Sequence, residues 1–218
     1  MANIFLIGAT GGVGIRLVPD LIARGHAVTG LHRKPEQAED LRAAGAMPVE
    51  ADLMEISASD LEMMVQGSDA VVFSAGAAGS GLDRTTAIDG DGPVKLIEAA
   101  RKTGVKRVYL VSVFPDAGRS RERRDGFEHY MAEKKRADAA LAGSELDYVI
   151  IRPGTLQSEA GDGRVRAGHA TPYGNVARGN VAAFIAELID TPLIRREIFE
   201  LTDGDVPVAE AVACLKRD

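Results

Sequence analysis

A glycine-rich turn close to the N-terminus constrains the fold of this chain more than any other feature. The mostly apolar residues 3–7 lead into glycines at positions 8, 11 and 14, and an amphipathic run from Val13 to Ala23 follows. This order predicts a strand, a tight turn and a helix. We expect Gly8 to turn the chain off the strand, Gly11 to let a phosphate approach the backbone, and Gly14 to let the helix pack closely. Because the helix N-terminus offers free N–H groups to a pyrophosphate, the pattern favours nucleotide binding over a glycine turn without a ligand.

Apolar runs alternate with helical patterns along the rest of the chain. We expect further strands at 27–31, 47–51, 70–73, 107–112, 148–151 and 197–201, and further helices at 36–44, 59–66, 85–103, 127–142, 179–189 and 208–215. Ser59 and Glu62 have the spacing of a capping box at the start of the third helix. The alternation predicts an α/β fold with one doubly wound parallel sheet and helices on both faces.

Composition and charge limit the class of protein. With 45% hydrophobic and 27% charged residues and no stretch resembling a linker, we expect one domain over residues 1–218. Its substrate-side lobe would be small, formed mainly by residues 154–178 and 203–218; the polar, glycine-rich stretch 155–175 is predicted to be a substrate lid with a short hairpin.

The net charge and the distribution of apolar residues favour a small-molecule partner. The net charge of −6 argues against non-specific nucleic-acid binding. No apolar run is long enough for a membrane span, and no basic segment precedes the first apolar run, so we expect no membrane association and a cytoplasmic location. The four histidines show no metal-ligand spacing, so we predict no metal site.

Two cations directly follow the second predicted strand. Proteins that bind NAD often place an acid at this point, whereas an arginine there suits the 2′-phosphate of NADP. Here the strand runs into His32-Arg33-Lys34, with no acid available. We therefore expect Arg33 to face the nucleotide and NADP(H) to be preferred over NAD(H). The alternative is a solvated basic turn.

Tyr130 and Lys134 are the candidate acid–base pair. They stand four residues apart on a predicted helix and so share one face. A lysine in that position can stabilise the tyrosinate and lower the pKa of the phenol, which would make Tyr130 a usable general acid or base. The alternative is an amphipathic helix with a boundary tyrosine and a surface lysine.

Taken together, these elements resemble the atypical short-chain dehydrogenase/reductase family, and in particular its small NAD(P)H-binding members of the NmrA-like or epimerase-like type. The most specific segments are residues 8–14, Ala137-Asp138, and residues 147–154, whose sequence is DYVIIRPG. The resemblance implies a Rossmann-type sheet with the cofactor along the strand ends. The cofactor-binding residues it implies are Gly8, Thr10, Gly11, Gly12, Val13 and Gly14 at the pyrophosphate, Arg33 and Lys34 at the 2′-phosphate, Asp52 and Leu53 at the adenine, Ala75, Gly76, Ala77, Tyr130 and Lys134 around the nicotinamide ribose, and Pro153 and Gly154 at the carboxamide.

The chain departs from that family at the end of the fifth predicted strand. Catalytic members often carry the second serine of a pair there, and this sequence has Ser112-Val113. Ser112 either substitutes for the missing serine or is only a structural hydroxyl. The chain also lacks the large C-terminal lobe of sugar epimerases, which favours a small substrate.

Two functions follow from these residues. The first is an NADP-dependent oxidoreductase, or an epimerase-like enzyme, for a small carbonyl or alcohol, with Tyr130, Lys134 and Ser112 as the catalytic set. The second is a non-catalytic NADP(H)-sensing protein. We expect a monomer or a homodimer in either case.

Overall fold

A parallel β-sheet forms the centre of the molecule. The computed structural model describes residues 1–115, 117–119, 122 and 124–216, and in these residues nine strands form one sheet in the order β11-β8-β10-β6-β5-β4-β1-β2-β3. The parallel strands are β1 (Asn3–Ile7), β2 (Ala27–His32), β3 (Met47–Glu50), β4 (Ala70–Phe73), β5 (Arg107–Val111), β6 (Asp147–Pro153) and β10 (Glu197–Asp203). The first six have the order 3-2-1-4-5-6, which confirms the doubly wound Rossmann-type fold.

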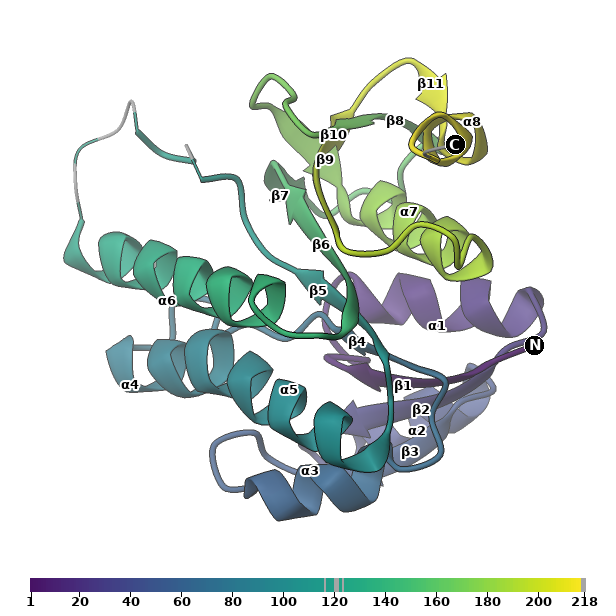
Figure 1. Cartoon of the computed structure of the whole chain (residues 1–218), viewed down its shortest axis with the longest axis vertical. Helices are drawn as coiled ribbons and strands as arrows, with labels where there is room; N and C mark the ends of the chain where they lie inside the picture. The colour runs from purple at the N-terminus through teal and green to yellow at the C-terminus, as the bar shows by residue number, and fades with distance from the viewer. Residues whose placement is uncertain (116, 120–121, 123, 217–218) are drawn as a thin grey trace.

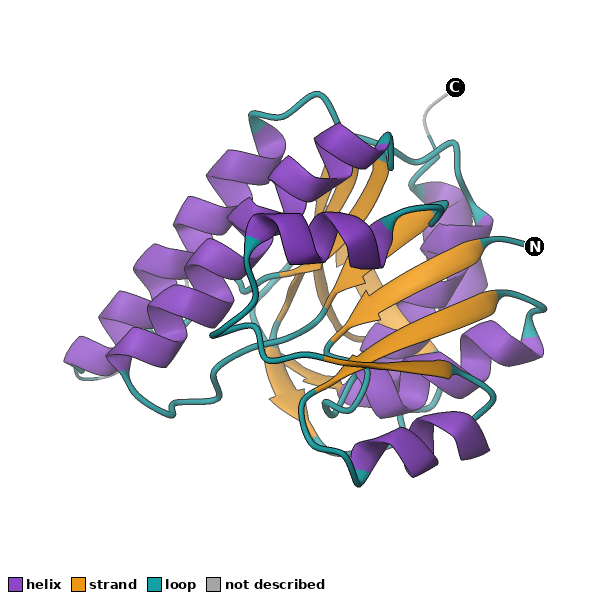
Figure 2. Cartoon of the chain, turned by 90° about the horizontal axis from the view of Figure 1, so that it is seen from below, coloured by secondary structure: helices purple, strands orange, loops and turns teal. Residues whose placement is uncertain are grey.

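Helices cover both faces of this sheet, so that the molecule has three layers (Figures 1 and 2). One face carries α1 (Gly14–Ala23), α2 (Gln37–Ala43), α7 (Arg178–Asp190) and α8 (Val208–Cys214); the other carries α3 (Ala58–Val65), α5 (Gly92–Thr103) and α6 (Asp125–Ala142). Successive residues of β1 serve opposite faces: Ile4 and Leu6 belong to the first apolar core, and Phe5 and Ile7 to the second. Burial on both faces explains why the central strands read as continuous apolar runs.

The helix predicted at 85–103 is longer and less regular than its sequence pattern indicated. It begins with α4 (Leu82–Thr85), passes through one π-helical segment, η1 (Thr86–Asp91), and continues as α5. Gly104 follows with φ +78°, a left-handed conformation that ends the helix.

The predicted capping box was wrong by two residues. Helix α3 begins at Ala58, so the N-cap is Ser57, whose backbone is extended. The Ser57 hydroxyl accepts a hydrogen bond from the N–H of Asp60 at 3.2 Å, and the Ser57 N–H donates to the Asp60 carboxylate at 2.9 Å. Ser59 already lies within the first turn and cannot cap it.

The predicted hairpin in the substrate-side segment was also wrong. Strand β7 (Thr155–Gln157) pairs in parallel with β9 (Asn175–Ala177), and between them β8 (Arg164–Gly168) joins the main sheet antiparallel to β10. The short strand β11 (Val206–Pro207) extends that edge antiparallel to β8. Parallel strands need a long connection rather than a tight turn. Here the connection between β7 and β9 includes β8, which belongs to the main sheet. None of the described helices is both long and apolar enough to cross a membrane.

Candidate functional site

A continuous groove runs across the carboxyl ends of the parallel strands, the edge where α/β sheets of this topology bind ligands. We divide it into a basic cleft of about 230 Å³, a central cleft of about 530 Å³ and an outer cavity of about 670 Å³. The basic and central clefts share the lining residues Gly11, Ser74, Ala75 and Gly76. The central cleft and the outer cavity share Ser112, Phe127, Tyr130 and Leu156.

The glycine turn forms the floor where the first two clefts meet. Gly8 has φ +91°, and a Cβ there would lie 2.7 Å from the backbone nitrogen of Ala75. Gly14 does not line the groove; a Cβ on it would collide with the carbonyl of Gly8, so its role is close packing of α1 on the turn. Among the described residues, no acceptor pairs with the N–H groups of Gly12 and Val13 at the start of α1. These free donors suit an anion.

The basic cleft gathers residues from five segments of the chain. Its lining includes the predicted residues Gly8, Thr10, Arg33, Asp52 and Leu53, together with Gln37 and Arg84, which the sequence analysis missed. The amide oxygen of Gln37 accepts the N–H groups of Arg33 at 3.2 Å and Lys34 at 3.0 Å and so fixes the turn that carries both cations. Lys34 does not line the cleft, and its ammonium lies 3.9 Å from the carboxylate of Glu36.

A buried ion pair supports the central cleft. The Lys134 ammonium lies 3.2 Å from one carboxylate oxygen of Asp89 and donates to the carbonyl of Val111 at 3.1 Å. The other carboxylate oxygen of Asp89 accepts the N–H of Ala77 at 2.9 Å. Asp89, missed from the sequence, therefore ties Lys134 to the loop after β4. Ala77 belongs to this loop but is buried, and it lines neither of the two clefts nor the outer cavity. Ala75 and Gly76, by contrast, line both the basic and the central cleft.

The expected effect of Lys134 on Tyr130 was wrong. Both side chains line the central cleft, but the ammonium lies 5.9 Å from the centre of the Tyr130 ring and its charge faces Asp89. Burial, and after it the negative charges of Asp89 and Asp138, raise the pKa of the Tyr130 phenol above its ordinary value. Tyr130 is therefore a phenol that holds its proton through the neutral range.

Ser112 presents a buried hydroxyl to the groove, with the carboxyl of Asp138 as a neighbour. Its side chain is 5% exposed and lines both the central cleft and the outer cavity, and no hydrogen-bond partner for its Oγ occurs among the described residues. Val113 lines only the outer cavity. Beneath Ser112, the Arg152 guanidinium donates to Asp138 at 2.9 Å. Burial raises the pKa of this carboxyl, although the neighbouring Ser112 hydroxyl, Arg152 and Lys134 oppose the shift.

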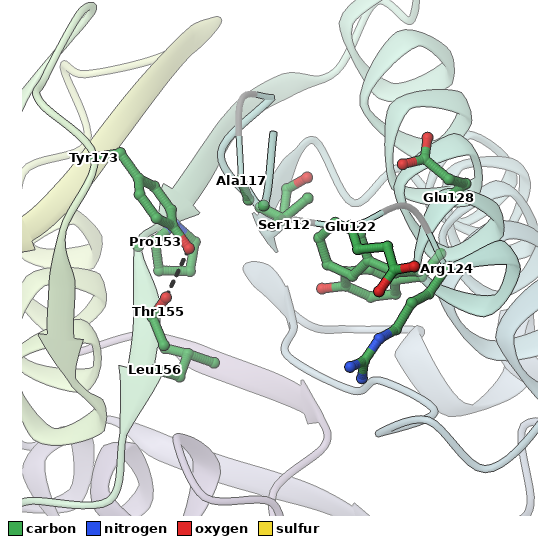
Figure 3. A pocket seen from close by; sticks show the side chains of 14 residues that line it. Ser112, Ala117, Glu122, Arg124, Glu128, Pro153, Thr155, Leu156 and Tyr173 are labelled. Atoms are coloured by element: carbon green, nitrogen blue, oxygen red, sulfur yellow. Dashed lines mark hydrogen bonds between the residues drawn. The ribbon is translucent and has the colours of Figure 1, made fainter. Parts of the chain in front are cut away.

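The outer cavity has two facing walls, and the charged side chains lie on one of them. Pro153 and Gly154, both predicted, lie beside Thr155, whose hydroxyl is 2.6 Å from that of Tyr173. Figure 3 shows this pair facing a second wall that carries Glu122, Arg124 and Glu128, with Ser112 between the two walls. Apolar side chains with a few polar groups are typical of small-molecule sites.

The groove as a whole fits a nicotinamide dinucleotide. An anion cradle lies in the middle, cations lie at one end, and a buried hydroxyl and a phenol lie at the other. In the part of the chain that the structure describes, no three His, Cys, Asp or Glu side chains are grouped to hold a metal ion. Fold and groove together define a dinucleotide-binding α/β protein.

Comparison with known proteins gives the family. Residues 8–192 match the model of the NAD(P)H-binding family, and the chain belongs to it. It is 39% identical over 217 residues to the uncharacterized sugar epimerase YhfK of Bacillus subtilis (strain 168), covering 96% of this chain and 98% of that one.

Two solved structures extend the comparison. A candidate NAD-dependent epimerase/dehydratase from Bacillus halodurans has a TM-score of 0.89 at 34% identity, over 99% of this chain and 100% of that chain. ChuY, an anaerobillin reductase from Escherichia coli O157:H7, has a TM-score of 0.78 at 27% identity, over 94% and 98%. The resemblance inferred from the sequence is confirmed at this level: an epimerase- and reductase-like member of an NAD(P)H-binding family.

Proposed function

We propose that this protein is an NADP(H)-dependent oxidoreductase for a small carbonyl or alcohol substrate. The observation that carries the proposal is the position of Ser112 and Tyr130, which both line the junction of the central cleft and the outer cavity. An unpartnered buried hydroxyl beside a protonated phenol is a suitable pair of donors for a carbonyl oxygen. The reductase among the structural relatives supports the same reaction class.

The preference for NADP(H) rests on the basic cleft. Arg33 and Arg84 both line it, which gives a 2′-phosphate two guanidinium groups. The acid in the cleft, Asp52, is partly committed, because its carboxylate accepts the N–H of Met54 at 2.9 Å. We propose Arg33 as the main 2′-phosphate ligand.

Each residue of the catalytic set has a separate task in this proposal. The nicotinamide, when bound, supplies or accepts the hydride. Tyr130 donates a proton to the carbonyl oxygen during reduction, and Ser112 donates a hydrogen bond to the same oxygen. Lys134, held by Asp89 and Val111, presents its remaining donor to the ribose hydroxyls in the central cleft. An epimerase would use the same side chains and return the hydride to the other face of its substrate.

The outer cavity favours a compact, partly apolar substrate over a nucleotide sugar. Its volume of about 670 Å³ is that of a small-molecule site, and Phe127, Leu156, Pro153 and Tyr173 supply apolar surface. Glu122, Arg124 and Glu128 on the opposite wall would orient polar substituents.

The alternative, a non-catalytic NADP(H) sensor, is motivated by Val113 at the usual serine position. A panel of aldehydes, ketones and quinones with NADPH distinguishes the two functions. We expect turnover by the wild type, and a loss in kcat/KM of about 100-fold or more in Tyr130→Phe. NADPH affinity should stay within about twofold, because the phenol is not needed for binding. Tight NADPH binding with no reduction of any compound would favour the sensor, and equal turnover in wild type and Tyr130→Phe would remove Tyr130 from the mechanism.

A further inference from the structure

Arg178, the first residue of α7, lies directly on the glycine turn. A Cβ placed on Gly12 would come within 2.6 Å of Arg178 Cδ and 2.8 Å of its Nε, so the arginine side chain packs flat against bare backbone. Arg178 also lines the central cleft, together with Gly11, Gly12 and Val13. It places a positive charge beside the free N–H groups that begin α1.

The hydrogen bonds of Arg178 use only part of its guanidinium. Nη1 donates to the hydroxyl of Ser158 at 3.2 Å and to the carbonyl of Leu156 at 3.4 Å. Among the described residues, neither Nε nor Nη2 has an acceptor, and no carboxylate pairs with Arg178. An arginine fork that is half-buried in a cleft and has uncommitted donors is suited to a phosphate.

A second arginine, Arg16, illustrates the alternative, a structural role in which the guanidinium binds backbone carbonyls. Arg16 of α1 donates through Nη1 to the carbonyl of Gly12 at 2.7 Å and through Nη2 to the carbonyl of Ser158. Both of its terminal nitrogens are therefore occupied by backbone. Arg16 and Arg178 both hold segment 156–158, but only in Arg178 are two adjacent nitrogens, Nε and Nη2, without an acceptor among the described residues.

We propose that Arg178 binds the pyrophosphate of the cofactor through Nε and Nη2 while its Nη1 holds segment 156–158. Leu156 forms a wall of both the central cleft and the outer cavity, so cofactor binding would fix the wall against which the substrate packs. The inference rests on the proposed dinucleotide function. It adds Arg178, from helix α7, to the residues that bind the cofactor phosphates. It also links the binding of the cofactor directly to the shape of the outer cavity.

Calorimetric titration with three probes separates this role from a structural one. The probes are NADP⁺, 2′-phospho-ADP-ribose, which keeps the pyrophosphate, and 2′-AMP, which lacks it. In Arg178→Met we expect the first two probes to bind about 10- to 100-fold more weakly, which is the loss of affinity expected when a charge-assisted hydrogen bond is removed. The affinity for 2′-AMP should stay within about twofold. Arg178→Lys should recover part of the loss, because it restores the charge without the planar fork.

Arg16→Met is the matched control, since it releases the same segment at a residue that lines neither of the two clefts nor the outer cavity. It should weaken NADP⁺ by no more than about threefold. Amide hydrogen exchange supplies the second readout: NADP⁺ should slow exchange over residues 155–158 in the wild type and in Arg16→Met but not in Arg178→Met.

The outcomes are distinct. Equal weakening of all three probes in Arg178→Met, or identical effects of Arg178→Met and Arg16→Met, would overturn the inference and leave the proposed function standing. A wild type that binds none of the three probes would overturn the proposed function, and this inference with it.

Discussion

The ammonium of Lys134 lies 3.2 Å from the carboxylate of Asp89, and both side chains are almost completely removed from solvent, at 4% and 0% exposed. Asp89 comes from the π-helical segment η1 and Lys134 from α6, so the pair joins two elements beneath the central cleft. π-Helical turns often occur at functional sites. The pair also affects the electrostatics of the site, because Asp89 compensates the charge of Lys134, whose ammonium lies 5.9 Å from the centre of the Tyr130 ring.

Removal of one partner should leave a buried charge uncompensated. We expect Asp89→Asn to lower the free energy of unfolding in urea by about 3–5 kcal/mol. Asp91→Asn, two residues away, breaks only the exposed contact with Arg136 and should cost less than about 1 kcal/mol. The double variant Asp89→Asn/Lys134→Met should recover part of the loss, since neither charge of this pair then remains buried. Equal losses of unfolding free energy in Asp89→Asn and Asp91→Asn would show that the buried ion pair contributes no more to stability than the exposed one.

Ser112→Ala should separate stability from turnover. Because the Ser112 hydroxyl makes no hydrogen bond of good geometry among the described residues and only neighbours Asp138, its removal should change the free energy of unfolding by no more than about 1 kcal/mol. Thr85→Val is the control: its buried hydroxyl donates to the Gly81 carbonyl at 2.9 Å, so its loss should destabilise by about 1 kcal/mol. Carbonyl reduction should fall only in Ser112→Ala. A marked loss of stability in this variant would instead make Ser112 a structural hydroxyl.

The raised pKa of Tyr130 predicts different pH dependences for the two reaction directions. Reduction uses the protonated phenol, so kcat/KM should be independent of Tyr130 titration through the neutral range. Oxidation of an alcohol needs the phenolate, whose fraction grows with pH, so its kcat/KM should rise without levelling below the ordinary phenol pKa of about 10. Both profiles should be measured, with Tyr130→Phe as the reference that lacks this titration. An oxidation profile that levels off near neutrality would contradict the assignment.

The contact between α1 and α7 should weaken in acid. Burial opposes ionisation of Asp190, but hydrogen bonds from Arg24 and His26 outweigh it and hold the pKa of this carboxyl below its ordinary value. A depressed pKa in the folded state stabilises the protein above the unfolded-state pKa, and this stabilisation is lost as the pH falls through the folded-state pKa. At neutral pH we expect Asp190→Asn to cost about 1 kcal/mol, or about 2–4 °C in melting temperature. The difference from wild type should shrink toward pH 3, and a difference that stays constant from neutral pH to pH 3 would contradict this account.

Features set by near neighbours in the sequence were predictable. The doubly wound parallel sheet follows from the alternation of apolar runs and helices, and the shared face of Tyr130 and Lys134 follows from helix geometry alone. The glycine turn was recognisable for the same reason: its packing is decided by residues 8 and 14 and by the strand and helix that flank them.

Features set by distant segments were not predictable. Asp89 lies near the start of the helix predicted at 85–103, and nothing local indicates that its carboxylate meets Lys134, 45 positions later. The burial of Tyr130, and after it the negative charge of Asp89, are also why the predicted direction of the Tyr130 pKa shift was wrong. Arg178 reaches the glycine turn only because α7 packs on α1, and the expected hairpin failed because β7 pairs with a strand beyond β8.

The central claim, that the groove binds NADPH with Arg33 at the 2′-phosphate, is tested most directly by nicotinamide fluorescence. Wild type, Arg33→Ala and Lys34→Ala are titrated with NADPH and NADH under the same conditions. The account predicts that wild type binds NADPH at least about tenfold more tightly than NADH. That preference should collapse in Arg33→Ala and persist in Lys34→Ala, whose ammonium is directed toward Glu36. Equal affinities for the two cofactors, unchanged in Arg33→Ala, would reduce Arg33 to a solvated turn residue, and binding of neither would contradict the dinucleotide site itself.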